Sequence, residues 1–342
     1  EDFESVINEI KIHDISTHRK PTFLNLKANW LNDKKEFDEA FKNFKNMNKL
    51  IKETKEFKRC KPNNFYNGIK NKILFIKKNE LDKTNEISFK SKWQQPVFLI
   101  GFPRSGTTLL DTVLRSHSEI SVVEEKPMLE KVFKSLNNKD DIEDIENINS
   151  KEAEKLVRIY FDEFKKQSGG EMKKILIDKL PLNILHIPLI NHIFPNAKYI
   201  FALRHPSDCI LSCWMQNFKL NDAMANLCDL KQAVDFYCTT MEFYEHCKKR
   251  YNLKIHKICY EELVNDFDKQ VINILNFLKL EWQNNIRNFQ KTASKRTIIK
   301  TPSYSQVIKP IYKTSIYRWK NYEQHLNKYN KKIIPWIERF GY

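Results

Sequence analysis

The chain has 342 residues, of which 41% are hydrophobic, so it can bury the core of one large domain and a smaller unit. Its formal net charge is +16, but the surplus of lysine is spread along the chain, together with asparagine and isoleucine. No basic run is interleaved with aromatic residues, so we expect no nucleic-acid partner. No apolar run approaches the length of a membrane span, so we expect no such span.

The cysteines and histidines show no metal-binding pattern. The seven cysteines include no C-x-x-C pair, which favours thiols in a reducing compartment and therefore a cytoplasmic location. The nine histidines do not cluster with cysteines or carboxylates at metal-ligand spacing, so we expect no metal.

Residues 1–92 are predicted to form a helical N-terminal segment. In 26–32 and 37–44, apolar and small residues recur at steps of three and four, with a polar joint between them. The pattern resembles one tetratricopeptide repeat, although any amphipathic helical hairpin would produce it. Solenoids need about three or more repeats to bury their faces, and only one is visible here. Because the sequence also begins at Glu1 and not at a methionine, we expect further repeats upstream. We expect a protein partner or a homodimer at this segment.

Residues 93–342 are predicted to form the second domain, in which strands and helices alternate. The predicted strands are Val97–Gly101, Ile120–Val123, Lys174–Asp178, Lys198–Leu203 and Lys254–Cys259. The predicted helices are Thr107–His117, Ile184–Ile193, Ser207–Phe218, Gln232–Arg250 and Asp268–Leu278. This alternation predicts an α/β fold with a doubly wound parallel sheet flanked by helices. Ligands of such folds bind outside the carboxyl ends of the strands.

The segment from Val97 to Leu110 reads as a strand, a tight glycine loop and a helix, as in the P-loop. Backbone N–H groups in such a loop form a cradle for an anion. Thr107 occupies the position of the lysine that contacts ATP phosphates, and the loop instead contains Arg104 and the Thr107 and Thr108 hydroxyls. This set favours a phosphosulfate over a metal-bound triphosphate. A degenerate nucleotide loop or an ordinary strand-turn-helix is the alternative.

The core from Pro103 to Leu109 resembles the 5′-phosphosulfate loop of the sulfotransferase superfamily. Within it, the likeness is to tyrosylprotein sulfotransferases and to bacterial sulfotransferases with tetratricopeptide repeats. The resemblance implies transfer of a sulfuryl group from 3′-phosphoadenosine 5′-phosphosulfate (PAPS) without a metal. The loop residues that it assigns to the cofactor are Arg104, Ser105, Gly106, Thr107 and Thr108.

Three further residues resemble the family's clamp on the 3′-phosphate of the cofactor. Arg204 follows an apolar strand, and Ser212 lies in the helix after it. Arg318 stands where the resemblance expects a phosphate-binding lysine, and a guanidinium can bind phosphate through two parallel hydrogen bonds. The alternative for Arg204 is that it pairs with a surface carboxylate.

The resemblance also assigns catalytic residues. Glu125, next to Glu124 at a strand end, aligns with the glutamate that acts as general base. Lys179 aligns with a lysine near the sulfuryl group, where a cation stabilises developing negative charge. Alternatively, the two glutamates are ordinary surface carboxylates, and Lys179 with Asp178 only ends the strand. Ser303 matches the first of two serines in a late loop, and Tyr304 replaces the second.

Tyr304 and Trp319 are candidates for stacking on adenine. The implied activity is in-line sulfuryl transfer to a hydroxyl of a peptide, glycan or small molecule. Tyrosylprotein enzymes have basic residues after the double glutamate, whereas only Lys126 precedes a proline here, which weakens the prediction of a tyrosine acceptor. The alternatives are a P-loop nucleotide kinase, disfavoured by Thr107, and a repeat-based interaction protein with a vestigial nucleotide domain.

Overall fold

The computed structural model describes residues 15–79, 93–137, 139–294 and 313–342. The chain divides into two compact units. We call the first, which comprises residues up to 68 together with 205–239 and 314–342, the helical unit. The second, residues 69–204 and 240–313, is the sheet unit. The predicted boundary at residue 92 lies among residues outside the described ranges, and it stays a prediction.

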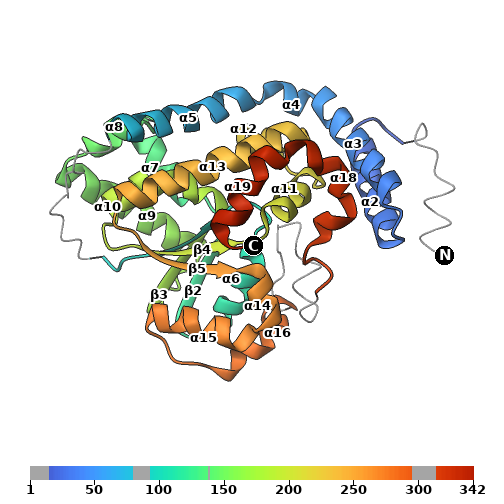
Figure 1. The fold of residues 1–342 in the computed structure, drawn as a ribbon. Helices are drawn as coiled ribbons and strands as arrows, with labels where there is room; N and C mark the ends of the chain where they lie inside the picture. Colours follow the sequence, from blue (N-terminus) through green and yellow to red (C-terminus); the bar gives the residue numbers. More distant parts are fainter. Residues whose placement is uncertain (1–14, 80–92, 138, 295–312) are drawn as a thin grey trace. The chain divides into compact units, whose positions relative to one another are not determined.

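The sheet unit is built on five parallel strands, which confirms the predicted α/β fold (Figure 1). They are β1 (Val97–Gly101), β2 (Ile120–Glu124), β3 (Ile175–Lys179), β4 (Lys198–Leu203) and β5 (Lys254–Cys259), in the order β2-β3-β1-β4-β5. The predicted bounds of β1, β4 and β5 are confirmed. Strands β2 and β3 each extend one residue further than predicted at the carboxyl end, so that Glu124 and Lys179 belong to the strands.

Strand β1 lies in the middle of the sheet because the chain continues first to one side and then to the other. Strands β2 and β3 lie on one side of β1, and β4 and β5 lie on the other. The loop after β1 is therefore at the point where the strand order reverses, which is where open α/β sheets bind ligands.

Alternation along the strands places different side chains on the two faces of the sheet. Val97 and Leu99 belong to an apolar core that includes residues of α6 (Thr107–Arg115) and α15 (Phe267–Leu278). Phe98 points to the other face, where its ring lies 6.0 Å from that of Tyr160 in α9 (Ser150–Gln167). Figure 1 shows α9 and α6 on opposite sides of the strands. Both faces are thus covered, as an all-parallel sheet requires.

Within the described ranges, the remaining helices that lie wholly in the sheet unit are short. They are α7 (Met128–Ser135), α8 (Ile142–Glu146), η1 (Pro181–His186), α10 (Ile187–Ile193), α14 (Tyr260–Asn265), η3 (Asn284–Asn288) and α16 (Phe289–Ser294). The single helix predicted over 184–193 is wrong, because a 3-10 helix precedes α10. Pro188 explains the break, since it has no N–H to continue a hydrogen-bonded ladder.

The helical unit contains the predicted N-terminal helices. It includes α2 (Lys20–Asp33), α3 (Phe37–Glu53), α4 (Lys55–Arg59), α11 (Pro206–Trp214), α12 (Asp222–Ala225), η2 (Asn226–Cys228), η4 (Arg318–Tyr322), α18 (Glu323–Leu326), η5 (Asn327–Tyr329) and α19 (Asn330–Phe340). Helices α5 (Pro62–Lys78) and α13 (Leu230–Arg250) have residues in both units. The α2–α3 hairpin is confirmed, while its tetratricopeptide-like character and its partner stay predictions.

All seven cysteines are thiols. Among the described helices, none has the length and apolar character needed to cross a membrane.

Asp178 is a buried carboxyl on the α9 face of β3. Its Oδ2 accepts a hydrogen bond of 3.1 Å from the hydroxyl of Tyr160, and its side chain is almost fully buried. Burial disfavours the charged form and raises the pKa of Asp178 from 3.8 to about 7. The neighbouring Lys179 points to the opposite face, so the two side chains of this charged pair have separate environments.

We predict that Asp178→Asn changes how stability depends on pH. Between pH 3.8 and about 7 the folded protein binds a proton that the unfolded chain releases, so this carboxyl makes the free energy of unfolding fall as pH rises. The amide cannot titrate. The variant should therefore gain stability relative to the wild type across this window. Urea denaturation at several pH values measures the difference, with the exposed Asp162→Asn as control. A difference that does not change with pH would contradict the prediction.

Candidate active site

The turn from β1 to α6 requires glycine at two positions. A Cβ on Gly101 would lie 2.5 Å from the carbonyl oxygen of Ala202 on the neighbouring strand. Gly106 has a φ of 93°, a left-handed conformation that disfavours side chains, and a Cβ there would lie 2.8 Å from the ring of Tyr260. The loop therefore passes close to β4 and α14, which hold its backbone in place.

Two arginines meet at this loop. Arg104 is itself in the left-handed region, with a φ of 68°, which is strained for an arginine and is typical of functional sites. Nη1 of Arg204, directly after β4, donates to the backbone carbonyl oxygen of Arg104 at 3.3 Å. The Arg204 guanidinium also lies 5.2 Å from the ring centroid of Tyr260, within cation–π range. Tyr260 thus contacts both the loop and Arg204.

The loop has the features of an anion cradle. Thr107 and Thr108 form the buried first turn of α6, a helix terminus where backbone N–H groups lack partners within the helix. The Ser105 hydroxyl is buried and has no hydrogen-bond partner in the described part of the chain. A buried hydroxyl without a partner costs free energy, so a ligand oxygen would satisfy it. The residues present fit a phosphosulfate group.

Lys179 forms the second part of the site, at the same edge of the sheet. Its side chain is fully buried, and its Nζ donates to Oε1 of Glu124 at 2.7 Å and to Oε1 of Glu125 at 2.9 Å. Glu124 and Lys179 are partners in the register of β2 and β3, so the sheet itself sets their separation. Glu125 follows β2, and its backbone N–H donates to the carbonyl oxygen of Lys179 at 2.8 Å.

The two glutamates keep Lys179 charged. Burial alone would lower the pKa of Lys179, but the Glu125 and Glu124 carboxylates outweigh that effect and raise it above its usual value. Asp111 of α6 also contributes to this increase. Asp111 is fully buried and accepts a 2.7 Å hydrogen bond from Arg115. An ammonium ion therefore stands at the carboxyl end of β3.

The two glutamates differ in access. The Glu124 side chain is 9% exposed, whereas that of Glu125 is 40% exposed. Glu125 has a φ of 49°, again in the left-handed region, which directs the chain away from the strand after Glu124. Glu125 is thus the carboxylate that a molecule from solvent can reach.

The structure brings some predicted residues together and places others elsewhere. Arg104–Thr108, Glu125, Lys179 and Arg204 lie in the sheet unit at the carboxyl ends of its strands. Ser212 and Arg318 belong to the helical unit, where Ser212 lies in α11 and Arg318 begins η4. Trp319, the one candidate for adenine stacking that lies among the described residues, is also in η4, where its ring stacks on His205. Ser303 and Tyr304 fall outside the described residues.

Sequence reasoning missed two residues of the site. The sequence analysis assigns no site role to Tyr260, yet its ring lies beside Gly106 and within cation–π range of Arg204. Asp111 was not singled out at all. Its position four residues before Arg115 only indicates a pair within the helix, and its effect on Lys179 depends on tertiary structure. Among the described residues, no His, Cys, Asp and Glu side chains gather as metal ligands would.

Comparison with known proteins points to one family. A model of the sulfotransferase family matches residues 96–284, more than half of the chain. An uncharacterized protein of Aquifex aeolicus (strain VF5) is 28% identical over 334 residues, which cover 89% of this chain and 43% of that protein. This chain therefore spans less than half the length of the Aquifex relative.

Two further matches have lower identity. Protein-tyrosine sulfotransferase A of Caenorhabditis elegans is 22% identical over 261 residues, covering 72% of this chain and 67% of that protein. The solved sulfotransferase domain from the Synechococcus PCC 7002 olefin synthase is 22% identical, covers 68% of this chain and 90% of that domain, and has a TM-score of 0.45. The family match includes the loop, Glu125, Lys179, Arg204 and Ser212, whereas Ser303, Tyr304 and Arg318 lie beyond its end. The chain belongs to the sulfotransferase family.

Proposed function

We propose that the protein transfers a sulfuryl group from PAPS to an acceptor hydroxyl, with Glu125 as general base. One observation carries the proposal: a fully buried Lys179 ammonium contacts a partly exposed Glu125 carboxylate at the strand ends beside the loop. General-base catalysis needs an accessible carboxylate, and sulfuryl transfer needs a fixed cation, so this pair supplies both.

The loop and Arg204 would hold the cofactor. The α6 N-terminus and the Ser105, Thr107 and Thr108 hydroxyls would donate hydrogen bonds to the 5′-phosphosulfate. The resemblance assigns the 3′-phosphate to Arg204, Ser212 and Arg318. Arg104, held in the left-handed conformation at the loop, would contribute positive charge near the sulfuryl group.

Glu125 and Lys179 would have different roles in the transfer, one toward the acceptor proton and the other toward the charge on the leaving oxygen. When bound, PAPS supplies the sulfuryl group that is transferred. Glu125 would accept the proton of the acceptor hydroxyl as that oxygen attacks sulfur. Lys179 would stabilise the negative charge that appears on the oxygen that leaves sulfur. Glu124 stays paired with Lys179 by the sheet register, so Lys179 keeps one carboxylate partner when Glu125 turns to the acceptor.

The acceptor is proposed as a hydroxyl compound, with a tyrosine side chain as one member of that class. Relatives named protein-tyrosine sulfotransferases align with most of this chain. Just after Glu125, however, Lys126 and Pro127 lead directly into α7, so only one basic residue is available there for an acidic peptide. An acceptor screen with radiolabelled PAPS, comparing peptides, glycans and small phenols, identifies the acceptor class.

We predict that adenosine 3′,5′-bisphosphate raises the melting temperature of the protein without a metal, and that ATP with Mg²⁺ does so far less. The loop has Thr107 where an ATP-binding loop has its lysine, and the family resemblance assigns Arg204 to a 3′-phosphate. Arg204→Ala should abolish the preference. Thermal-shift measurements with both nucleotides check this. A larger shift with ATP and Mg²⁺ would favour a nucleotide kinase instead.

We predict that Glu125→Gln abolishes transfer and leaves the affinity for adenosine 3′,5′-bisphosphate nearly unchanged. The amide keeps the size of the side chain but cannot accept the proton, a loss on the order of 10²–10⁴ in rate. Glu124→Gln is the matched control, because it changes the neighbouring, more buried carboxylate. Its effect on rate should be much smaller. Should Glu124→Gln prove the more damaging change, Glu124 would be the base.

We predict that Lys179→Met lowers turnover more than it weakens product binding. A cation at the leaving oxygen interacts more strongly with the transition state than with the bound substrate or product. Single-turnover transfer is compared with calorimetric titration of adenosine 3′,5′-bisphosphate. Lys174→Met serves as the control, because Lys174 is an exposed lysine directly before β3, the strand that ends at Lys179. Equal losses in rate and affinity would make Lys179 a ground-state ligand of the phosphate.

A further inference from the structure

Arg318 is held in place by the N-terminal hairpin of the helical unit. Its Nε donates to Oδ1 of Asn32, in the last turn of α2, at 3.1 Å. The hydroxyl of Tyr322 donates to the same oxygen at 2.8 Å, and Tyr322 is fully buried. Residues 32 and 318 are 286 positions apart in the sequence. Because a guanidinium is planar and rigid, a hydrogen bond at Nε also sets the direction of its remaining N–H groups.

The partner of Arg318 is neutral, which leaves the charge of the guanidinium available. An amide oxygen accepts a hydrogen bond without neutralising the cation, as a carboxylate would. Among the described residues, no carboxylate forms an ion pair with Arg318, and its buried Nη2 has no hydrogen-bond partner. A buried cationic donor without a partner is costly, and an anion bound there would satisfy it.

The same hairpin supports α11, the helix that contains Ser212. Nδ2 of Asn48 donates to the carbonyl oxygen of Trp214, and Nδ2 of Asn25 donates to that of Met215, both at 2.8 Å. These bonds satisfy carbonyl groups at the end of α11 that have no partner within the helix. The ring of Phe41 in α3 lies 4.6 Å from that of Trp214.

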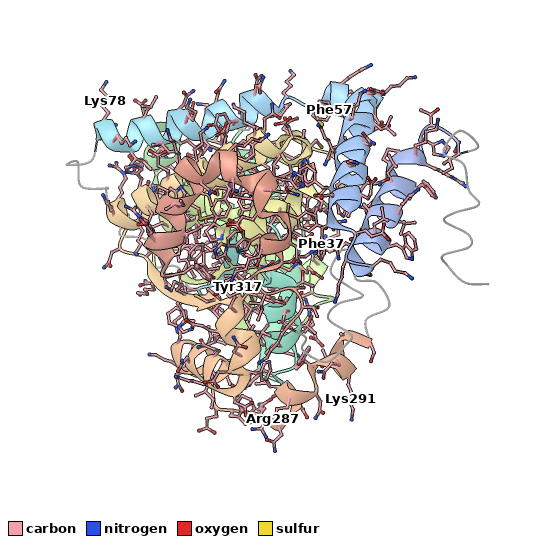
Figure 2. The ribbon with its side chains drawn as sticks, turned by 45° about the vertical axis from the view of Figure 1, so that its right-hand side comes forward. Phe37, Phe57, Lys78, Arg287, Lys291 and Tyr317 are labelled. Atoms are coloured by element: carbon pink, nitrogen blue, oxygen red, sulfur yellow. The ribbon has the colours of Figure 1, made fainter. Side chains whose placement is uncertain are left out.

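Helix α11 and the turn η4 are also joined to each other. The backbone N–H of Trp319 donates to Oδ1 of Asp208 in α11 at 2.8 Å. Phe37, labelled in Figure 2 at the start of α3, packs edge-on against Tyr322 with 5.5 Å between ring centroids. The hairpin therefore contacts α11 and η4, which contain Ser212 and Arg318, two of the three residues assigned to the 3′-phosphate.

We propose that Asn32 is a positioning residue, which orients Arg318 toward the 3′-phosphate of the cofactor. The α2–α3 hairpin is then part of the support for that binding group. This inference rests on the proposed function, because only there is Arg318 assigned to the 3′-phosphate. It adds a specific dependence of 3′-phosphate recognition on a residue of the N-terminal helices.

The test measures how strongly the protein prefers adenosine 3′,5′-bisphosphate over adenosine 5′-phosphate, by calorimetric titration of both. Asn32→Ala should reduce this preference about tenfold or more, since hydrogen bonds to charged groups are among the stronger ones. Asn29→Ala is the matched control on the same helix, because within the described ranges the Asn29 side chain bonds to Asn25 and not to Arg318. The control should keep the full preference. If Asn32 had a merely structural role, Asn32→Ala would lower the melting temperature and reduce the affinity for both nucleotides equally.

Asn32→Asp provides a second test if the alanine variant folds poorly. The carboxylate keeps an acceptor for Arg318 and Tyr322 but neutralises the guanidinium, so the preference should fall although the melting temperature is maintained. An unchanged preference in Asn32→Asp would overturn the inference.

Arg318→Ala separates this inference from the proposed function. If Arg318→Ala keeps the full preference, its assignment to the 3′-phosphate is wrong and the role of Asn32 falls with it. If Arg318→Ala loses the preference while both Asn32 variants keep it, the proposed function stands and only the inference about Asn32 is overturned.

Discussion

The site depends on a lysine ammonium that has no exposed surface. Removing a charge from water is costly unless partners compensate for it, and Lys179 has two carboxylates within 2.9 Å. The parallel pairing of β2 with β3 places Glu124 directly opposite Lys179, and the left-handed turn at Glu125 brings the second carboxylate back to it. The cation therefore stays charged inside the protein for three reasons: the strand order, the turn at Glu125, and Asp111 on the buried face of α6.

The local parts of the site could be predicted from the sequence because their chemistry is contained in short segments. The spacing of Gly101 and Gly106 after an apolar run identifies the loop, and both glycines prove to be required by close contacts. Arg204 and Lys179 were assigned through the family resemblance, and both lie where a predicted strand ends. The carboxyl ends of parallel strands meet at one edge, so residues placed there by the alternation of strands and helices lie near each other.

The rest could not be predicted because it depends on contacts between distant segments. Nothing in the sequence around Tyr260 shows that its ring fills the space beside Gly106, 154 positions earlier by residue number. The pairing of Asn32 with Arg318 is of the same kind. Helix periodicity identified the hairpin but not its contacts with α11 and η4, since asparagines on a helix usually face solvent. Pattern reasoning therefore treated the N-terminal helices as a separate partner-binding segment.

The unequal anchoring of the two glutamates has a consequence for how such a site can diversify. Glu124 is fixed by strand pairing, whereas Glu125 begins the connection to α7. Under the proposed function, changes after Glu125 in that connection would reshape the surface offered to an acceptor while Glu124 stays paired with Lys179. The scaffold thus separates a carboxylate fixed by the sheet register from one that belongs to a surface connection. Under the proposed function, acceptor choice would depend on this one connection, whereas donor binding would depend on the loop after β1.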